Sequence, residues 1–354
     1  MQIKHINDPI LLWYNKKKRS LPFRFTTNPY KIWLSEVMLQ QTRVNTVIPY
    51  YNNWIKSYPS LLSVANAKLS SLLKIWEGLG YYSRCKNFHQ ACKIVVNDFQ
   101  GIVPSNLKDF KSLPGVGDYT ASAVLSIAYK KPYPVIDTNV KIVLCRLLGI
   151  KNYNKYNKNR VQKLLTQIIS KKYPGNFNQG LMEIGALICT STNPVCKICP
   201  IKSFCIAFQR DKPDGYPIKN KRKKLPHYEI AVGIIWRGDK FYVQRRDKEA
   251  MLGGLWEFPG GKVEPGESLT DGLKRKLNEE CGFSAKINKK IACINHAYSH
   301  FSFSLHLFQC EENKGKIKKR FDTKWIRPRE IHSLPFPKAN HKLFKILKKF
   351  GWYV

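Results

Sequence analysis

Four closely spaced cysteines are the residues whose types and spacing most clearly allow chemistry. Cys189, Cys196, Cys199 and Cys205 follow the pattern C-x6-C-x2-C-x5-C. Four thiolates in so short a stretch can surround one metal centre, either a zinc ion or an iron–sulfur cluster. Disulfides are less favoured, because nothing in the sequence indicates secretion. The cysteines therefore predict a metal centre that holds together the end of a domain.

Two carboxyl groups could carry acid–base chemistry. Glu36 lies in a helix that we expect to begin at Asn28 and Pro29, and its neighbours three and four residues away are largely apolar. Apolar surroundings raise the pKa of a carboxyl group, which suits a general acid near neutral pH. The alternative is a partly exposed glutamate on an ordinary amphipathic helix. Asp137 is placed to cap a helix from Thr138, where it would stay ionised and could stabilise a cationic sugar.

A glycine turn between two predicted helices could bind a phosphate. The turn is Pro114-Gly115-Val116-Gly117, and the second helix begins at Asp118. Glycines let the backbone approach a ligand closely, and the amides at a helix start favour an anion such as a DNA phosphate. A tight helix–helix turn without a ligand is the alternative.

Composition points to a polyanionic partner. The chain has 354 residues, long enough for two domains, and a formal net charge of +37. Such an excess of Lys and Arg favours binding to nucleic acid, although a generally lysine-rich proteome would explain part of it. No stretch approaches the roughly 20 apolar residues of a membrane span, and the N-terminal apolar run is too short for a signal peptide. We expect a cytoplasmic, nucleoid-associated monomer.

The elements that must position these residues change character along the chain. Residues 1–212 show helical periodicity, residues 213–227 read as a linker rich in Pro, Gly and Lys, and residues 228–354 mix strands and helices. The sequence therefore predicts an all-α domain followed by an α+β domain. The clearest elements of the second domain are strands at Ile230–Ile235, Lys240–Gln244 and Phe301–Phe308 and a helix at Leu269–Cys281.

Several motifs together resemble one family. The strings WLSEVMLQQTRV, GLGYYSR, LPGVG and IDTNV and the cysteine loop occur in this order and spacing in the adenine DNA glycosylases of the MutY family. These are helix-hairpin-helix enzymes, and the resemblance covers residues from about 8 to 210. It implies that the four cysteines hold a 4Fe–4S cluster rather than zinc.

The resemblance also implies a role for each matched residue. Glu36 would protonate the adenine, Asp137 would stabilise the oxocarbenium-like sugar, and Tyr119 and Asn139 would support these carboxyl groups. The residues implied to contact DNA or the flipped adenine are Arg24, Gln41, Thr42, Leu79, Tyr81, Gly115, Gly117 and Glu183. Among them, Gln41 and Tyr81 would wedge into the duplex.

The position after the hairpin separates two related reactions. The endonuclease III branch carries there a lysine that forms a Schiff base and cleaves the strand, whereas this chain has Asp118-Tyr119-Thr120. The resemblance therefore implies a monofunctional enzyme that leaves an abasic site. A bifunctional glycosylase/lyase and a non-catalytic DNA-binding protein are the alternatives.

Residues 261–283 resemble the Nudix box. The matching positions are Gly261, Glu267, Arg275, Leu277, Glu279, Glu280, Gly282 and Phe283. Lys276 stands where the box has a glutamate, so a positive charge lies where Mg²⁺ should bind, and this argues against the alternative of a nucleotide pyrophosphohydrolase.

The MutY family has a Nudix-like C-terminal domain that recognises 8-oxoguanine. Tyr298, Ser299 and His300 resemble its recognition loop, which is usually Phe-Ser-His. The resemblance therefore implies a double-stranded DNA substrate with adenine opposite 8-oxoguanine or guanine. The expected reaction is hydrolysis of the N-glycosidic bond of that adenine, in base excision repair.

Overall fold

A computed structural model of the protein describes residues 5–218, 224–247, 249–282, 285–312, 322–349 and 351–352. Part of the predicted linker, residues 219–223, and Phe283 of the Nudix box lie outside these ranges. The chain divides into two compact units, Met1–Asn66 with Asn87–Lys221 and Ala67–Lys86 with Arg222–Val354. The boundaries at residues 212 and 228 stay a prediction, and the grouping of residues 67–86 with the second unit was not predicted from the sequence.

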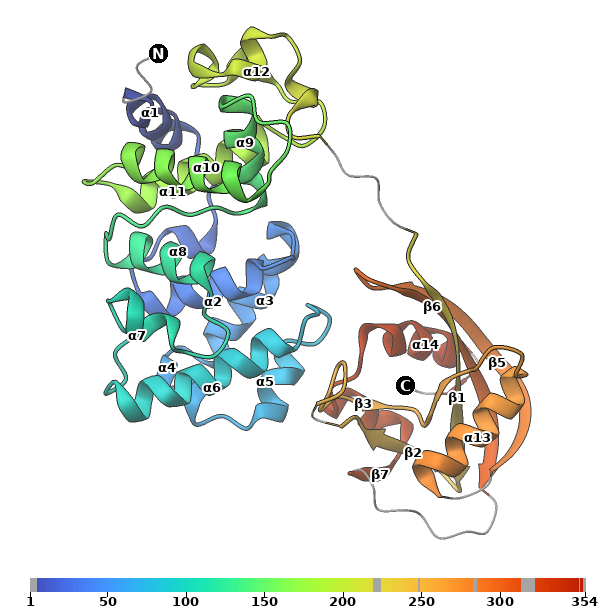
Figure 1. Cartoon of the computed structure of the whole chain (residues 1–354). Helices are drawn as coiled ribbons and strands as arrows, with labels where there is room; N and C mark the ends of the chain where they lie inside the picture. The colour runs from blue at the N-terminus through green and yellow to red at the C-terminus, as the bar shows by residue number, and fades with distance from the viewer. Residues whose placement is uncertain are drawn as a thin grey trace. The chain divides into compact units, whose positions relative to one another are not determined.

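The described part of the first unit is helical (Figure 1). Its helices are α1 (Asn7–Lys17), α2 (Pro29–Leu39), α3 (Val44–Ser57), α4 (Leu61–Ala65), α6 (Ser83–Asp98), α7 (Leu107–Lys111), α8 (Asp118–Ala128), α9 (Thr138–Leu147), α10 (Lys155–Ile168), α11 (Pro174–Leu187) and α12 (Ile206–Gln209), with the first residues of α6 belonging to the second unit. Helix α5 (Leu69–Ile75) lies within the segment grouped with the second unit. The predicted all-α character of the first unit is confirmed.

Local capping explains where the helices of the site begin. The Asn28 side chain accepts a hydrogen bond from the Lys31 amide at the start of α2, and Asp137 accepts one from the Val140 amide at the start of α9. Each such cap contributes about 1 kcal/mol, because it satisfies an amide that has no partner within the helix. Both caps confirm the helix starts predicted from the sequence.

Two glycines let α11 approach its neighbours closely. A Cβ atom at Gly180 would lie 2.8 Å from Cγ2 of Ile10 in α1, and one at Gly185 would lie 2.7 Å from Cβ of Asn139 in α9. Glu183 stands between the two glycines, so this packing holds its carboxylate near the start of α9. The core around these helices is apolar and includes Val140, Leu144, Phe177, Leu181 and Ile184.

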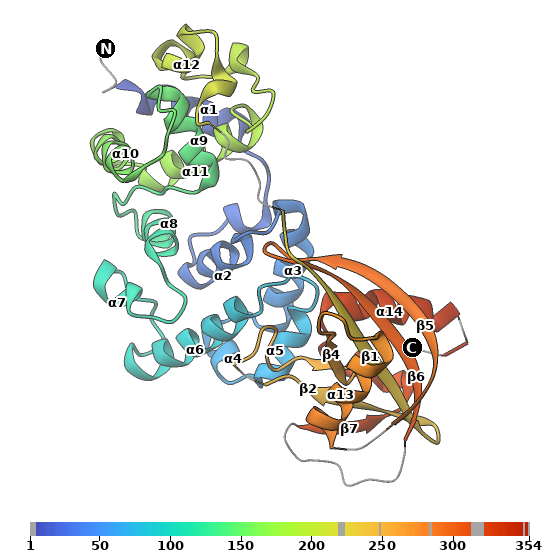
Figure 2. The same cartoon turned by 45° about the vertical axis from the view of Figure 1, so that its right-hand side comes forward.

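A twisted seven-stranded sheet is the centre of the second unit (Figure 2). Its strands are β1 (His227–Arg237), β2 (Lys240–Arg245), β3 (Trp256–Glu257), β4 (Gly260–Lys262), β5 (Ala285–Ala297), β6 (Ser302–Glu312) and β7 (Thr323–Ile326). The order is β3-β2-β1-β6-β5, with β4 paired to β1 and β7 to β2. Only β1 and β6 pair in parallel among the described strands.

One long helix covers each face of the sheet. Helix α13 (Leu269–Cys281) packs through Leu273 and Leu277 on one apolar cluster, and α14 (Lys338–Lys349) packs through Leu343 and Leu347 on the other. The predicted α+β class is confirmed, and the predicted helix at 269–281 has the bounds expected. Within the ranges that the structure describes, no helix has the length and apolar character needed to span a bilayer.

We predict that Gly185→Ala destabilises the protein. Alanine is about 1 kcal/mol better than glycine inside an isolated helix. Here its methyl group would meet the Asn139 backbone carbonyl at 3.0 Å, and such overpacking costs about 1–3 kcal/mol. Urea unfolding should therefore show a lower free energy of unfolding.

Gly215→Ala is the matched control, because a Cβ atom there would have no neighbour within 4 Å. We expect that variant to stay within about 0.5 kcal/mol of the parent protein. A Gly185→Ala variant that is as stable as the parent, or more stable, would show that α11 and α9 are not in this close contact.

Candidate active site

A cavity of about 570 Å³ in the helical unit collects the four predicted catalytic residues and three of the predicted base-binding residues. The predicted residues that line it are Arg24, Glu36, Thr42, Tyr119, Asp137, Asn139 and Glu183. They come from segments that are up to 159 positions apart in the chain, as Arg24 and Glu183 are. The cavity is large enough for one nucleobase, since pockets for small ligands usually measure about 300–1,000 Å³.

Glu36 projects from α2 into this cavity with almost no contact with solvent. Its side chain belongs to a residue only 6% exposed, which excludes the alternative of a partly exposed surface glutamate. The pKa of Glu36 is raised to about 7, because burial and the nearby Asp137 charge together outweigh the Tyr119 hydrogen bond and the Arg24 charge, which lower it. The Tyr119 hydroxyl donates to Oε2 of Glu36 at 2.7 Å.

Asp137 occupies the first position before α9. Its Oδ1 accepts the Val140 amide at 2.6 Å, and its Oδ2 accepts a longer bond from Nδ2 of Asn139 at 3.4 Å. The pKa of Asp137 is raised from its ordinary value, because burial outweighs these donors and the Asn139 amide, which favour the ionised form. The cavity thus holds two carboxyl groups in different surroundings, one poorly solvated and one surrounded by hydrogen-bond donors.

Glu183 is held by two arginines, one of which the sequence did not reveal. Arg19 donates from Nε and Nη2 to both Glu183 oxygens at 2.5–3.1 Å, and Arg24 Nη2 donates to Oε1 at 2.7 Å. Burial favours a raised pKa for Glu183, but the two guanidinium groups overcome it and lower the pKa to about 2. Arg19 could not be found from the sequence, because its role depends on the burial of Glu183 beside it, and that burial is visible only in the folded structure.

Arg24 has one nitrogen whose hydrogen-bonding capacity is unused. Its Nη1 atom is buried and has no hydrogen-bond partner among the described residues, although its Nη2 is bonded to Glu183. A buried donor without a partner is costly, so its position at the cavity wall suits a ligand that carries an acceptor. The pair Arg24–Glu183 therefore presents both a donor and an acceptor to whatever fills the cavity.

A second and larger hollow of about 1230 Å³ adjoins the first. Gln41, Gly115 and Gly117 line it, together with Thr42, Tyr119, Asp137 and Asn139, which also line the smaller cavity. Gly115 has a φ of +77°, and a Cβ there would lie 2.9 Å from Asn87, so the turn requires glycine. Gly117 has nothing within 4 Å of its Cβ position, which leaves its backbone open to a ligand.

The loop that contains Leu79 and Tyr81 lies in the segment grouped with the second unit. Neither residue lines the two hollows described above. Leu79 is buried, whereas Tyr81 is 39% exposed and has a φ of +48°. Arg84 donates to the carbonyls of Leu79, Gly80 and Tyr81 and so braces this left-handed backbone.

Gln41 shares this unusual backbone conformation, with a φ of +56°. Left-handed residues other than glycine cost about 1–3 kcal/mol and concentrate at functional sites. Gln41 and Tyr81, for which the family resemblance implies a role as wedges into the duplex, are therefore both held in strained backbone.

The four cysteines follow α11, in a segment that contains short 3-10 turns at Cys196–Ile198 and Lys202–Phe204. Burial raises the pKa of each thiol, and the charges of neighbouring cysteines raise the pKa of Cys199, which reaches about 12, as well as that of Cys189. Arg146 donates from Nη1 to the Cys189 sulfur at 3.3 Å. In the described ranges, no three His, Cys, Asp or Glu side chains are grouped closely enough for a single metal ion.

The predicted reading loop joins β5 and β6. Ser299 and His300 are exposed, and Oγ of Ser299 lies 3.3 Å from Nδ1 of His300. Tyr298 anchors the loop, because its ring packs on His296 and Phe301 and its amide donates to the Phe301 carbonyl at 2.8 Å. Two polar side chains are therefore presented to solvent from a firmly packed base.

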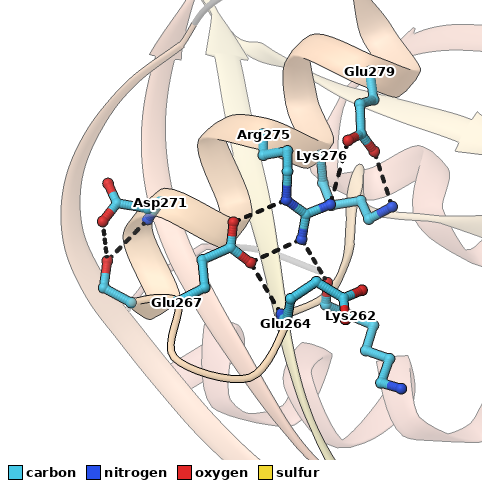
Figure 3. Close-up of polar contacts among 8 residues, drawn as sticks. Lys262, Glu264, Glu267, Asp271, Arg275, Lys276 and Glu279 are labelled. Carbon is cyan, nitrogen blue, oxygen red and sulfur yellow. Dashed lines mark hydrogen bonds and ion pairs between the residues drawn. The ribbon is translucent and has the colours of Figure 1, made fainter.

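The Nudix-like segment forms an internal network of ion pairs (Figure 3). Arg275 binds both oxygens of Glu267 at 2.8 Å, and Lys276 Nζ binds Glu279 at 2.9 Å. The hydrogen bonds from Arg275 and from the Glu264 amide lower the pKa of Glu267 to about 2. Carboxylates that would otherwise hold a divalent cation are thus engaged by cations of the chain itself.

Comparisons with known proteins agree with this two-part organisation. A family model of the HhH-GPD superfamily of base excision DNA repair proteins matches residues 34–171, and a model of the NUDIX domain matches residues 231–345. An adenine DNA glycosylase of Buchnera aphidicola subsp. Schizaphis graminum is 34% identical over 98% of this chain and 100% of its own length. The adenine DNA glycosylase of Homo sapiens is 30% identical over 95% of this chain and 73% of its own length.

Solved structures resemble the helical part. A thermostable thymine-DNA glycosylase is 29% identical, with a TM-score of 0.54 over 58% of this chain and 95% of that one. A trapped endonuclease III–DNA covalent intermediate is 23% identical, with a TM-score of 0.52 over 59% of this chain and 97% of that one, and it supports the fold alone.

Proposed function

Because the chain belongs to the adenine DNA glycosylases of the MutY family, we propose that it removes adenine mispaired with 8-oxoguanine or guanine. The reaction is hydrolysis of the bond between the base and the sugar, in base excision repair. One observation carries this proposal: the cavity holds a buried carboxyl group with a pKa near 7 beside a second, hydrogen-bonded carboxyl group. That arrangement suits an acid and a charge stabiliser working on one bond.

Arg24, Glu36 and Asp137 have different roles in the proposed excision of adenine. The adenine leaves the helical stack and enters the cavity, where the buried Arg24 donor can bond to a ring nitrogen. Glu36 gives its proton to the adenine ring, and the bond from the base nitrogen to the sugar carbon breaks with its electron pair on the base. Asp137 stabilises the positive charge that develops on the sugar until water adds and loses a proton.

A monofunctional reaction fits the residues at the hairpin. Tyr119 follows Asp118 after the glycine turn, and its hydroxyl is bonded to Glu36 rather than free to attack the sugar. No lysine is among the described residues that line the smaller cavity, and of the two that line the adjoining hollow, Lys141 and Lys158, the first lies over the Tyr153 ring. We therefore expect an abasic site as the product, without the strand cleavage that a lysine Schiff base would produce.

The second unit is proposed to read 8-oxoguanine. Exposed Ser299 and His300 on a firmly packed turn can bond to the edge of an oxidised purine. The Nudix-like box is proposed as a structural remnant rather than a hydrolase site, because Lys276 and Arg275 already neutralise Glu279 and Glu267.

A 4Fe–4S cluster is proposed at the four cysteines. The resemblance of the cysteine loop to that of the helix-hairpin-helix DNA glycosylases implies this cluster. Cys189, Cys196, Cys199 and Cys205 would supply its four thiolate ligands. The cluster would cross-link the loop after α11, and the Arg146 hydrogen bond to Cys189 would help to hold its thiolate.

We predict that Glu36→Gln abolishes excision and leaves duplex binding intact. Loss of a general acid costs about 10²–10⁴-fold, and the amide keeps the shape of the side chain. The assay is single-turnover excision of adenine opposite 8-oxoguanine, with an adenine–thymine duplex beside it and alkali to reveal abasic sites. Asp98→Asn, at an exposed position of α6, is the control and should react like the parent.

Full activity of Glu36→Gln would remove Glu36 from its role. If the parent protein itself produced no abasic site in the mispaired duplex while binding it tightly, the chain would be a non-catalytic DNA-binding protein. Strand cleavage before alkali would instead restore the glycosylase/lyase alternative.

We also predict that Ser299→Ala with His300→Ala weakens the preference for 8-oxoguanine over guanine. A neutral hydrogen bond contributes about 0.5–1.5 kcal/mol, so the ratio of the two excision rates should fall by up to about tenfold. Ser333→Ala, in an exposed turn of the same unit, is the control. An unchanged ratio in the double variant would place the reader elsewhere in the protein.

A further inference from the structure

Helix α14 carries a single stripe of lysines on its solvent face. Because an α-helix turns 100° per residue, positions separated by 4, 7 and 11 residues return to nearly the same side. The residues of the stripe are Lys338, Lys342, Lys345 and Lys349, and all four are exposed. The opposite side of α14 is buried against the sheet through Ala339, Asn340, Leu343, Phe344 and Leu347.

The charges of this stripe are not neutralised within the described part of the chain. Helix α14 contains no Asp or Glu, and none of its four stripe lysines forms an ion pair with a described residue. Helix α13, on the other face of the same sheet, is the contrast, because Lys274 pairs with Asp271 and Lys276 with Glu279. Like charges four residues apart repel each other, so an anionic partner would stabilise the stripe.

The stripe begins beside the proposed reading loop. Lys342 Nζ donates to the Asn295 carbonyl of β5 at 2.7 Å. Burial lowers the pKa of His296, and the charges of Lys342 and Lys338 lower it further, as expected for close neighbours. The His296 ring in turn lies 4.9 Å from the ring of Tyr298, the first residue of the loop.

We propose that the lysine stripe of α14 binds the sugar–phosphate backbone of the duplex next to the 8-oxoguanine. This inference rests on the proposed function, since it uses the reading loop at Ser299 and His300 as the neighbouring contact. Eleven residues of helix extend about 16 Å, and one DNA strand carries a phosphate for about every 3.4 Å of helix axis. The stripe is therefore long enough to follow four phosphates, and it positions the duplex without reading its sequence.

The test is the salt dependence of DNA binding by the full-length protein. Lys338, Lys342, Lys345 and Lys349 are all replaced by Gln, and the dissociation constant is measured from 50 to 200 mM salt. The duplex carries 8-oxoguanine opposite a stable abasic analogue, so that no reaction occurs. Each lost phosphate contact should reduce the slope of log K against log salt by about 0.9, or about 3–4 in all. Between 50 and 200 mM salt, the dissociation constant of the parent should therefore rise by a factor roughly 100 times larger than that of the variant.

A matched control removes the same charge from other exposed parts of the unit. It carries Gln at Lys274, Lys286, Lys289 and Lys290, which lie on α13 and the first half of β5. This control should keep the slope of the parent to within about one unit. A variant with Arg at the four stripe positions should also keep it, because the charges remain, and thermal melting of each protein checks that it is folded.

Each outcome separates the inference from the proposed function. An unchanged slope in the Gln variant, or an equal loss in the control, would overturn the stripe as a DNA contact and leave it as a solvated surface. Weaker binding of the variant to anionic lipid vesicles, with DNA binding unchanged, would overturn it in favour of a membrane surface. If the slope falls as expected but the parent excises no adenine, the stripe stands and the proposed function fails.

Discussion

The burial of one carboxyl group is the constraint on which the rest of the helical unit depends. Glu36 is useful as an acid only if it is kept from water, and keeping it from water costs free energy that the surrounding packing must supply. Gly180 and Gly185 allow α11 to approach α1 and α9 closely, and α11 contributes Met182 and Glu183 to the lining of the cavity. The Tyr119 hydroxyl donates one hydrogen bond to Glu36, which reduces the free-energy cost of burying this carboxyl group. The pKa of Glu36 nevertheless stays near 7.

The other charged groups of the cavity are paired with one another, which limits how far they lower the pKa of Glu36. Glu183 takes its cations from Arg19 and Arg24, and Asp137 takes its donors from the start of α9. If Arg24 were not shared with Glu183, its charge would act more strongly on Glu36 and lower the pKa of that acid. In the second unit, Arg275 pairs with Glu267 and Lys276 with Glu279, so these two carboxylates of the Nudix-like box are already neutralised, whereas Glu280 accepts a hydrogen bond from Gln244.

Local signals in the sequence predicted more of the fold than long-range ones did. The caps at Asn28 and Asp137, the glycine turn and the helix at Leu269–Cys281 depend on residues within one or two turns, and each was predicted. The Arg19–Glu183 pair joins residues 164 positions apart, and the parallel pairing of β1 with β6 joins distant strands, so neither has a local signature. Even for Glu36, the sequence showed apolar neighbours on its own helix but not the helices that cover it.

We propose that Glu36 acts as an acid because burial keeps it protonated near neutral pH, and the pH dependence of single-turnover excision tests this role. An acid must be protonated to react, so the rate constant should be highest below pH 7 and fall about tenfold per unit well above pH 7. At low pH the rate constant should fall again, because Asp137 becomes protonated and can no longer stabilise a positive charge. A rate constant that stays level from pH 6 to pH 9 on the adenine–8-oxoguanine duplex would contradict the account.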